Sequence, residues 1–180
     1  MNLISCVKRE DWGIGKNGEL LFHIPEDLKI FKQKTINNTV IMGRKTFESL
    51  PGNTLEDKLL KDRRNIIITK DKNFNVDGAI ICNNINNIFR LMKFKIIDYD
   101  KTWIIGGESI YKLFLPYCKF AEITKVEDPN AQNIKPDVFF PNLDVNPDWK
   151  IHISYNEPRY YKGLCYKYYV YVNKNSILPY

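Results

Sequence analysis

Short apolar runs alternate along this chain with segments whose apolar residues recur at helical spacing. The runs at 3–7 and 39–42 are apolar at consecutive positions, which is typical of strands buried on both faces. Proline at position 25, followed by two acids, predicts the start of a helix. The expected strands are 3–7, 39–42, 65–69, 79–82, 101–105 and 120–126, and the expected helices are 25–34, 45–50, 84–93 and 109–115.

The end of the chain has a different pattern. Residues 149–155 and 165–173 are rich in Tyr, Val and Ile, and the segment between them contains Pro158 and Gly163, which predicts a hairpin. Alternating strands and helices predict an α/β fold with a central, mostly parallel twisted sheet, helices on both faces and a C-terminal antiparallel hairpin. With 180 residues, 44% of them hydrophobic, we expect one domain over residues 1–180.

The net charge of +6 favours anionic partners, either nucleic acid or small phosphorylated and carboxylate ligands. The densest basic cluster contains Lys58, Lys61, Arg63 and Arg64, but three acids interrupt it. Because no run of like charge resembles a nucleic-acid-binding arm, we expect solvated charge and no nucleic-acid partner. A basic nucleic-acid-binding module stays as a rival, which predicts binding that weakens steeply with salt.

The four cysteines, Cys6, Cys82, Cys118 and Cys165, are far apart, and the chain has two histidines. Without a CxxC pair we expect no metal site, and the apolar neighbours of Cys6, Cys82 and Cys165 indicate buried free thiols. The chain shows no signal-peptide pattern and no apolar run long enough to cross a bilayer. We therefore expect a cytoplasmic protein with no membrane partner.

Four strand-to-helix junctions contain chemically unusual residues, and ligands of parallel sheets bind beyond the carboxyl ends of the strands. The first junction, 12–19, has three glycines within six residues. Glycine allows a loop to approach a ligand closely or to move, but a plain flexible connector fits equally well.

The second junction begins the helix at Pro25. Asp27 and Phe31 are four residues apart and share a helix face with Leu28, so a carboxylate lies on an apolar stripe. An acid that complements the helix dipole is the simpler interpretation, and Glu26 fits it better than Asp27 does. A carboxylate among apolar residues needs a partner, such as a ligand with two adjacent N–H donors.

The third and fourth junctions have features of phosphate sites. Gly43-Arg44-Lys45-Thr46 places two cations at a helix start, where they oppose the helix dipole unless an anion binds there. Gly106-Gly107 also joins a buried strand to a helix, but the chain lacks the GxGxxG fingerprint of ordinary dinucleotide-binding folds. Two such junctions in one small sheet suit a dinucleotide, whose phosphates lie at separate places.

Taken in order, these segments resemble the dihydrofolate reductase family from residue 3 to about 141, and the terminal hairpin also agrees. The most specific segment is 43–49. The further matching residues are Gly13, Ile14, Gly15, Asn17, Gly18, Ile24 to Leu28, Phe31, Thr35, Arg63 to Asn65, Ile105, Gly106, Gly107, Tyr111, Thr124, Asp137, Phe140 and Pro141. The resemblance implies NADPH-dependent reduction of 7,8-dihydrofolate to 5,6,7,8-tetrahydrofolate, with hydride passing from the nicotinamide C4 to the pterin C6 and a proton reaching N5.

The resemblance also implies site residues for the substrate. Asp27 and Thr124 are the expected catalytic pair, with Asp27 accepting hydrogen bonds from the pterin. Arg63 is expected to hold the glutamate α-carboxylate of the substrate with its bidentate guanidinium. The full set of expected substrate-binding residues is Ile4, Asp27, Leu28, Phe31, Leu50, Arg63 and Thr124.

For the cofactor, Arg44 with Thr69 and Lys70 is expected near the 2′-phosphate, which favours NADPH over NADH. Family members have a cis peptide at the position of Gly106-Gly107. The expected cofactor-binding residues are Cys6, Ile14, Gly15, Asn17, Gly18, Leu20, Gly43, Arg44, Lys45, Thr46, Thr69, Lys70, Ile105, Gly106, Gly107, Glu108, Ser109, Ile110 and Tyr111.

The chain departs from the family at a few positions. Leu21-Phe22 stands where the family usually has Pro-Trp, so Phe22 lacks the indole N–H that would hold a water near the pterin. The segment 53–62 is longer than in short members, which makes the register of Arg63 less secure than that of Asp27. Aspartate at position 27 is the bacterial-type choice. We expect a monomer that binds dihydrofolate and antifolate inhibitors, without a fused thymidylate synthase. A same-fold reductase of another pterin-like or pyrimidine compound, and a catalytically inactive relative, are the remaining alternatives.

Overall fold

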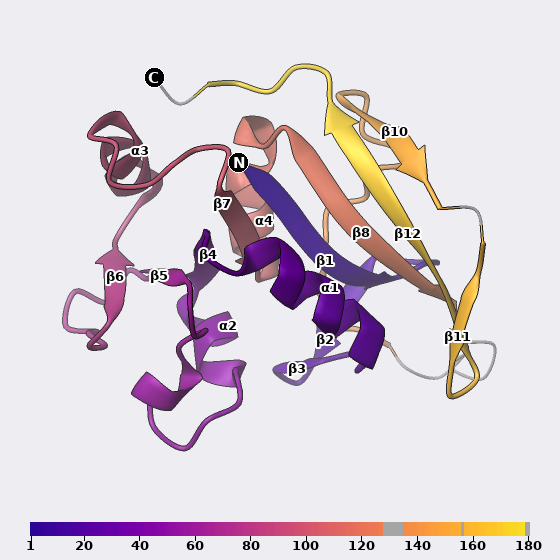
Figure 1. The fold of residues 1–180 in the computed structure, drawn as a ribbon, viewed down its shortest axis with the longest axis horizontal. Helices are drawn as coiled ribbons and strands as arrows, with labels where there is room; N and C mark the ends of the chain where they lie inside the picture. The colour runs from indigo at the N-terminus through magenta and orange to yellow at the C-terminus, as the bar shows by residue number, and fades with distance from the viewer. Residues whose placement is uncertain (128–134, 156, 179–180) are drawn as a thin grey trace.

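A computed structural model describes residues 1–127, 135–155 and 157–178. Its central sheet has the order β10-β12-β8-β1-β7-β4-β5-β6, with β11 paired to β12 (Figure 1). The six strands from β8 to β6 are parallel, and β10, β11 and β12 are antiparallel to their neighbours. The strands of this sheet are β1 (Asn2–Lys8), β4 (Thr39–Gly43), β5 (Arg64–Ile68), β6 (Ala79–Cys82), β7 (Thr102–Gly106), β8 (Phe120–Glu127), β10 (Trp149–Ser154), β11 (Arg159–Tyr161) and β12 (Leu164–Asn173).

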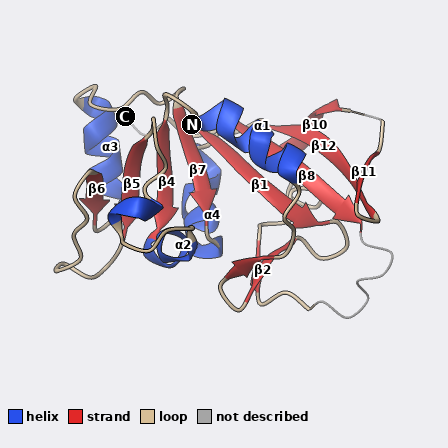
Figure 2. Cartoon of the chain, turned by 60° about the horizontal axis from the view of Figure 1, so that its bottom comes forward, coloured by secondary structure: helices blue, strands red, loops and turns tan. Residues whose placement is uncertain are grey.

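Helices cover both faces of the parallel strands, and each face has its own core. Helices α1 (Pro25–Thr35) and α2 (Arg44–Ser49) contribute to a cluster around Val40, Met42 and Ile67. Helices α3 (Ile85–Lys93) and α4 (Glu108–Phe114) contribute to the larger cluster on the opposite face. Two short 3-10 helices, Glu56–Lys58 and Leu115–Tyr117, lie in connections. The sheet therefore forms the middle of three layers (Figure 2).

The direction in which successive strands are added to the sheet reverses at its centre. After β1 the chain skips one position to form β4, moves outward to β6, and returns to place β7 between β1 and β4. Strand β8 then pairs on the other side of β1. Such a reversal of strand order is where ligands bind in open parallel sheets, at the carboxyl ends of the strands. The junctions singled out from the sequence follow β1, β4 and β7 and therefore meet at this point.

The sequence-based expectation of the fold is confirmed, including the mixed sheet and helices on both faces. The differences are at element ends, by one residue, and in four short strands that were not expected, one of which, β11, lies in the segment expected as the turn of the tail hairpin. Strands β2 (Gly13–Lys16), β3 (Glu19–Leu20) and β9 (Val138–Phe139) form a separate small sheet in the order β3-β2-β9. The glycine-rich segment expected as a loop is thus a short hairpin, held by a strand more than 110 residues away. The expected turn at 156–163 includes residue 156, which lies outside the described residues.

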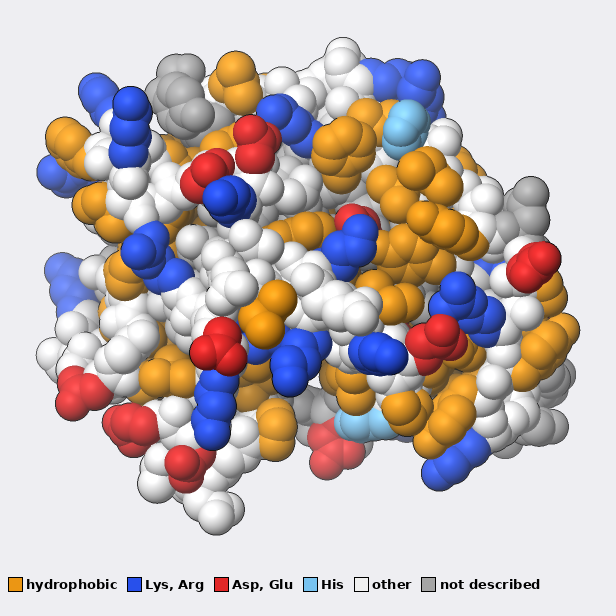
Figure 3. Space-filling view, viewed as in Figure 1, with side chains coloured by type: hydrophobic (Ala, Val, Ile, Leu, Met, Phe, Trp, Pro, Cys, Tyr) orange, Lys and Arg blue, Asp and Glu red, His pale blue; other side chains and the backbone are white. Residues whose placement is uncertain are grey.

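One face of the antiparallel part of the sheet is only partly covered. Helix α1 crosses β1 and β8, and apolar side chains gather beyond it over β12 and β10 (Figure 3). Phe120, Ile153 and Tyr155 are between 37% and 51% exposed. The hairpin expected from the tail therefore completes the sheet without burying all of its own apolar residues.

Candidate active site

The centre of the candidate site is the point where β1 and β7 separate. The two strands are paired only at Asn2 with Trp103 and Leu3 with Ile104, so the carbonyl of Ile4 has no strand partner on that side. The hydroxyl of Tyr111, on α4, donates to this carbonyl at 2.8 Å. The Tyr111 ring is buried. It keeps the ends of β1 and β7 apart, and Ile4 lies at the edge of the opening.

Asp27 lies beside this opening, although it comes from the helix layer. In the first turn of α1 its Oδ1 accepts a hydrogen bond from Thr124 Oγ1 of β8 at 2.5 Å. Thr124 is opposite Cys6 in the pairing of β8 with β1. Three residues far apart in the sequence thus lie at one place, where Thr124 is 3% exposed and Asp27 is half-buried.

Burial raises the pKa of Asp27 above its ordinary 3.8, and the hydrogen bond from Thr124 opposes this shift. Burial also raises the pKa of the Cys6 thiol, and the nearby Asp27 carboxylate adds to the rise. Cys6 is therefore a neutral wall of the site, whereas Asp27 is a carboxyl group poised to hold or release a proton nearer to neutral pH.

Replacing Thr124 by valine removes the one hydrogen bond that favours the charged form of Asp27. Because that bond lowers the pKa of Asp27, the variant's pKa is expected to be higher than in the parent protein. The pH dependence of kcat/KM for dihydrofolate, the substrate that the family resemblance implies, should shift to higher pH in Thr124→Val. The control Thr124→Ser keeps the hydroxyl and should keep the parent profile. A Thr124→Val profile identical to the parent would show that this bond does not tune Asp27.

The expected walls of the substrate site come from α1, from β1 and from the end of α2. Phe31 and Leu50 are half-buried and pack with buried Ile4 in one cluster. Leu28, one residue after Asp27, is 45% exposed. An exposed leucine beside a buried carboxyl group suits contact with a flat ligand, because that contact would cover apolar surface.

Arg63 reaches the same face of α1 from the start of β5. Its Nε donates to Thr35 Oγ1 at 2.8 Å, and Thr35 in turn donates to the carbonyl of Phe31 at 2.7 Å. Its Nη1 donates to the carbonyl of Lys61 at 2.9 Å. The neighbouring Arg64 instead donates to the carbonyl of Ile96. Of the two adjacent arginines, only Arg63 therefore points toward the helix of Asp27, with further guanidinium donors left for a carboxylate.

The junctions after β4 and β7 approach each other closely. The peptide bond Gly106–Gly107 is cis, and Gly106 has a φ of 114°. A Cβ on Gly106 would meet the Tyr111 ring at 3.1 Å, and one on Gly107 would meet Thr46 Oγ1 at 3.1 Å. Gly43 lies against Ile110 at similar range. Side chains at these glycines would press against Tyr111, Thr46 and Ile110, so glycine is what allows the two junctions and α4 to pack this closely.

Arg44 was expected to oppose the dipole of its helix, and the structure shows how that conflict is relieved. Its Nε is 2.6 Å from Glu48 Oε1 and its Nη1 is 2.7 Å from Asp71 Oδ2. Its guanidinium also lies 4.5 Å from the centre of the Phe74 ring. Two carboxylates therefore compensate the charge of Arg44, while neighbouring Lys45 is exposed.

The remaining residues expected at the cofactor lie in different surroundings. Thr69 is buried after β5, and Lys70 beside it is exposed. Ile105 is half-buried in β7 and Ser109 is exposed on α4. The carboxylate of Glu108 pairs with Lys112 and accepts from the N–H of Phe139 at 2.9 Å. Glu108 thus ties α4 to the small sheet.

The segment 13–20 belongs to the small sheet rather than to the edge of the central one. Ile14 is buried in the larger core, whereas Asn17, Gly18 and Leu20 are exposed on the hairpin. The N–H of Asn17 donates to Asp137 Oδ2 at 2.8 Å, and the N–H of Asp137 donates to the carbonyl of Gly15 at 3.1 Å. Asp137 therefore holds the tip of the hairpin.

Replacing Asp137 by alanine removes a charge-assisted hydrogen bond at an exposed tip. Such a bond contributes about 1.5 kcal/mol, so local opening of the hairpin should become roughly tenfold more frequent. Amide hydrogen exchange at Asn17 should rise accordingly in Asp137→Ala, with exchange in β1 unchanged as the internal control. Equal exchange at Asn17 in both proteins would contradict this role.

Contacts around the first turn of α1 involve residues that were not expected in the site. Phe22, noted in the sequence as a departure, is 8% exposed and packs with Ile24, Val126 and Tyr166. The hydroxyl of Tyr166 donates to Glu26 Oε2 at 2.6 Å, and Arg159 pairs with the same carboxylate. The first turn of α1 is thus anchored to β11 and β12, a contact that sequence spacing alone did not indicate.

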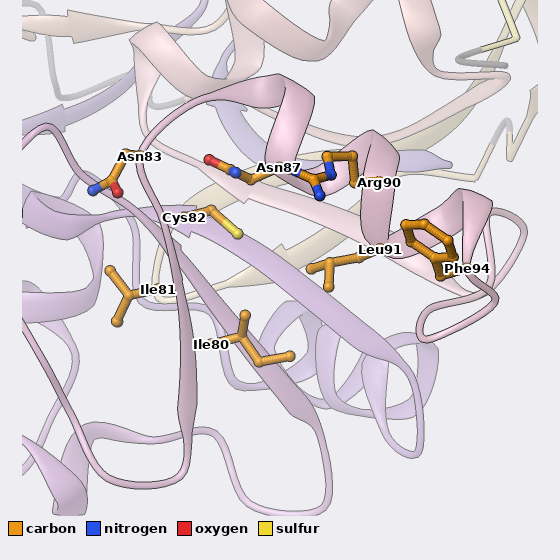
Figure 4. A pocket seen from close by; sticks show the side chains of 8 residues that line it. All are labelled: Ile80, Ile81, Cys82, Asn83, Asn87, Arg90, Leu91 and Phe94. Atoms are coloured by element: carbon orange, nitrogen blue, oxygen red, sulfur yellow. The ribbon is translucent and has the colours of Figure 1, made fainter.

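A pocket of about 320 Å³ lies away from these junctions, between β6 and α3 (Figure 4). The residues that line it are Ile80, Ile81, Cys82, Asn83, Asn87, Arg90, Leu91 and Phe94. None of these residues was expected in the site, and none supplies a carboxylate. The chemistry described above therefore does not depend on this pocket.

A model of the family described as dihydrofolate reductase matches residues 1–172. The chain belongs to the dihydrofolate reductase family. It is 35% identical over 137 residues to a dihydrofolate reductase of Staphylococcus haemolyticus, covering 76% of this chain and 74% of the relative. It is 30% identical over 181 residues to a bifunctional dihydrofolate reductase-thymidylate synthase of Glycine max, covering 93% of this chain but 32% of the relative. The chain thus spans about a third of that bifunctional protein.

A solved structure agrees with this family assignment. The dihydrofolate reductase from Enterococcus faecalis, complexed with NADP(H) and RAB-propyl, matches with a TM-score of 0.75 and 26% identity over 96% of this chain and 95% of the other. Within the described part of the chain, no helix combines the length and apolar character that crossing a membrane requires.

Proposed function

We propose that this member of the dihydrofolate reductase family reduces 7,8-dihydrofolate to 5,6,7,8-tetrahydrofolate with NADPH. The observation that carries the proposal is the half-buried carboxyl group of Asp27, which Thr124 binds beside the separated ends of β1 and β7. Asp27 accepts hydrogen bonds from adjacent N–H groups of the pterin, and its raised pKa favours proton supply at N5 through a water molecule. Ile4, Leu28 and Phe31 form apolar walls that exclude other water.

Substrate selection rests on the far end of the α1 face. Arg63, held by Thr35 and the carbonyl of Lys61, binds the α-carboxylate of the glutamate part of the substrate. Phe31 and Leu50 lie between Arg63 and Asp27 along this path and contact the aminobenzoyl group. A compound without that carboxylate loses the Arg63 contact, which favours dihydrofolate over a smaller pterin or pyrimidine substrate.

The residues present fit NADPH, which supplies the hydride when bound. Gly106 and Gly107 carry no side chain and pack closely against Tyr111 and Thr46, so only backbone would face the pyrophosphate at this junction. Arg44, Lys45 and Thr46 bind its phosphates, and Arg44 with Thr69 and Lys70 lies toward the 2′-phosphate. Tyr111 and Cys6 shape the uncharged side of the site next to the nicotinamide, and the hairpin around Asn17 covers it.

The direct test mixes the purified protein with NADPH and dihydrofolate and follows the loss of NADPH absorbance. We expect steady oxidation that requires dihydrofolate, with a higher KM for NADH than for NADPH. A protein that oxidises NADPH only with another pterin or pyrimidine compound would support the same-fold alternative. Absence of oxidation with any of these compounds would contradict the proposed activity.

We further propose a monomer that acts in the cytoplasm and is inhibited by antifolates that mimic the pterin. All four cysteines are free thiols, which suits a reducing compartment. Sedimentation of the purified protein tests the monomer. A diaminopyrimidine inhibitor that competes with dihydrofolate would support the pterin site, and loss of this inhibition in Asp27→Asn would place it on Asp27.

A further inference from the structure

Arg44 is held on two sides by carboxylates, and one of them is unusual in its rigidity. Glu48 is one helical turn away on α2, and its exposed side chain is free to change rotamer. Asp71 instead comes from the connection between β5 and β6, and its Oδ2 is 2.7 Å from Arg44 Nη1. The two acids reach the guanidinium from different elements, so they need not respond to a ligand in the same way.

The position of Asp71 is determined by its own segment. Its Oδ1 accepts from the N–H of Asn73 at 2.9 Å, and its N–H donates to Thr69 Oγ1 at 3.2 Å. The N–H of Thr69 donates to the carbonyl of Cys82 in β6 at 3.0 Å. The Asp71 carboxylate is therefore part of a turn that is anchored to the sheet, and its position beside Arg44 does not depend on Arg44 alone.

We propose that Asp71 is a specificity-determining residue that limits the preference of this enzyme for NADPH over NADH. The inference rests on the proposed function, in which Arg44 faces the 2′-phosphate. That phosphate carries a charge of about −1.5 to −2 near neutral pH, whereas NADH has an uncharged hydroxyl there. A fixed carboxylate at the same guanidinium repels the phosphate and competes for its donors, but it has little effect on the hydroxyl.

The variant Asp71→Asn removes this charge and keeps an oxygen that can accept from the N–H of Asn73. An exposed charge pair contributes about 0.2–1 kcal/mol, so the Kd of NADPH should fall by a factor of about 1.4 to 5. The Kd of NADH should not change. Both constants can be measured by quenching of tryptophan fluorescence, without turnover. The gain for NADPH should shrink as salt increases, because the interaction is between exposed charges.

Asp77, an exposed acid in the same connection, provides the matched control. Asp77→Asn changes the net charge equally and should leave both constants unchanged. An unchanged or smaller ratio of the NADH to the NADPH constant in Asp71→Asn, or an equal rise in this ratio in Asp77→Asn, would overturn the role of Asp71. If the parent protein bound neither cofactor, the proposed function itself would fail. This outcome is distinguishable from failure of the Asp71 proposal, because it is measured on the parent protein without any variant.

Discussion

Asp27→Asn is expected to retain NADPH binding while turnover near pH 7 falls at least about 100-fold, the usual contribution of a positioned acid or base. The amide keeps the shape of the carboxyl group and its contact with Thr124, but it cannot accept both pterin N–H bonds or supply a proton. Fluorescence titration with NADPH and steady-state turnover measure the two effects separately. Undiminished turnover would remove Asp27 from the mechanism.

The neighbouring acid provides the control for this result. If Asp27 only complemented the helix dipole, Glu26→Gln would reduce turnover as much as Asp27→Asn does. Because Glu26 is bound to Arg159 and Tyr166 instead, its variant should keep most of its turnover.

The same substitution is expected to stabilise the protein. Burial raises the pKa of Asp27 in the folded state above its unfolded value, so the unfolded chain ionises first as pH increases. The favourable contribution of the protonated group is present below pH 3.8 and is lost as pH rises through the folded pKa. Thermal unfolding of Asp27→Asn should therefore show a higher Tm at neutral pH, with little difference in acid. A lower Tm at neutral pH would mean that the charged carboxylate stabilises the fold.

Arg63→Leu should weaken dihydrofolate binding about 10- to 100-fold and NADPH binding far less. A hydrogen-bonded contact to a charged group contributes about 1.5–3 kcal/mol, and leucine removes both the charge and the donors. The Kd values of the two ligands, measured for the same variant, provide the comparison. Equal weakening of both ligands would show that Arg63 acts through the fold rather than on the substrate.

The adjacent arginine tests the register. Arg64 bonds to the carbonyl of Ile96, away from α1, so Arg64→Leu should leave dihydrofolate binding nearly unchanged. Arg63→Lys keeps the positive charge but loses the planar pair of guanidinium donors. The Kd of dihydrofolate for Arg63→Lys should therefore lie between those of the parent and Arg63→Leu. If Arg64→Leu weakened dihydrofolate binding more than Arg63→Leu, Arg64 and not Arg63 would be the arginine that binds the substrate carboxylate.

The sequence pattern predicted those helices and strands that neighbouring residues in the sequence determine. Pro25 and the two acids after it begin α1, and consecutive apolar residues form the buried parallel strands. Strands β2, β3 and β9 were not predicted, because β3 has two exposed residues and because β2 is completed by a partner more than 110 residues away. Pairing of this kind depends on the tertiary fold rather than on propensity.

The same distinction applies to the site. Asp27, Thr124 and Arg63 were expected from the family pattern, and spacing alone left Asp27 open to the dipole interpretation. Thr35 as the support of Arg63, and Asp71 as the partner of Arg44, were not expected, since each contact joins residues 27 or 28 positions apart in the sequence. Neither residue type is distinctive without that contact.

The bond between Thr124 and Asp27 also has a consequence for the order of folding. It joins α1, the first helix, to β8, the last of the parallel strands, across 97 positions of sequence. Contacts of such separation form late, because loop closure must precede them. During refolding, the ability to reduce dihydrofolate should therefore return only after β8 docks beside β1, even where the helices have already formed. Recovery of activity then reports completion of the sheet rather than its initiation.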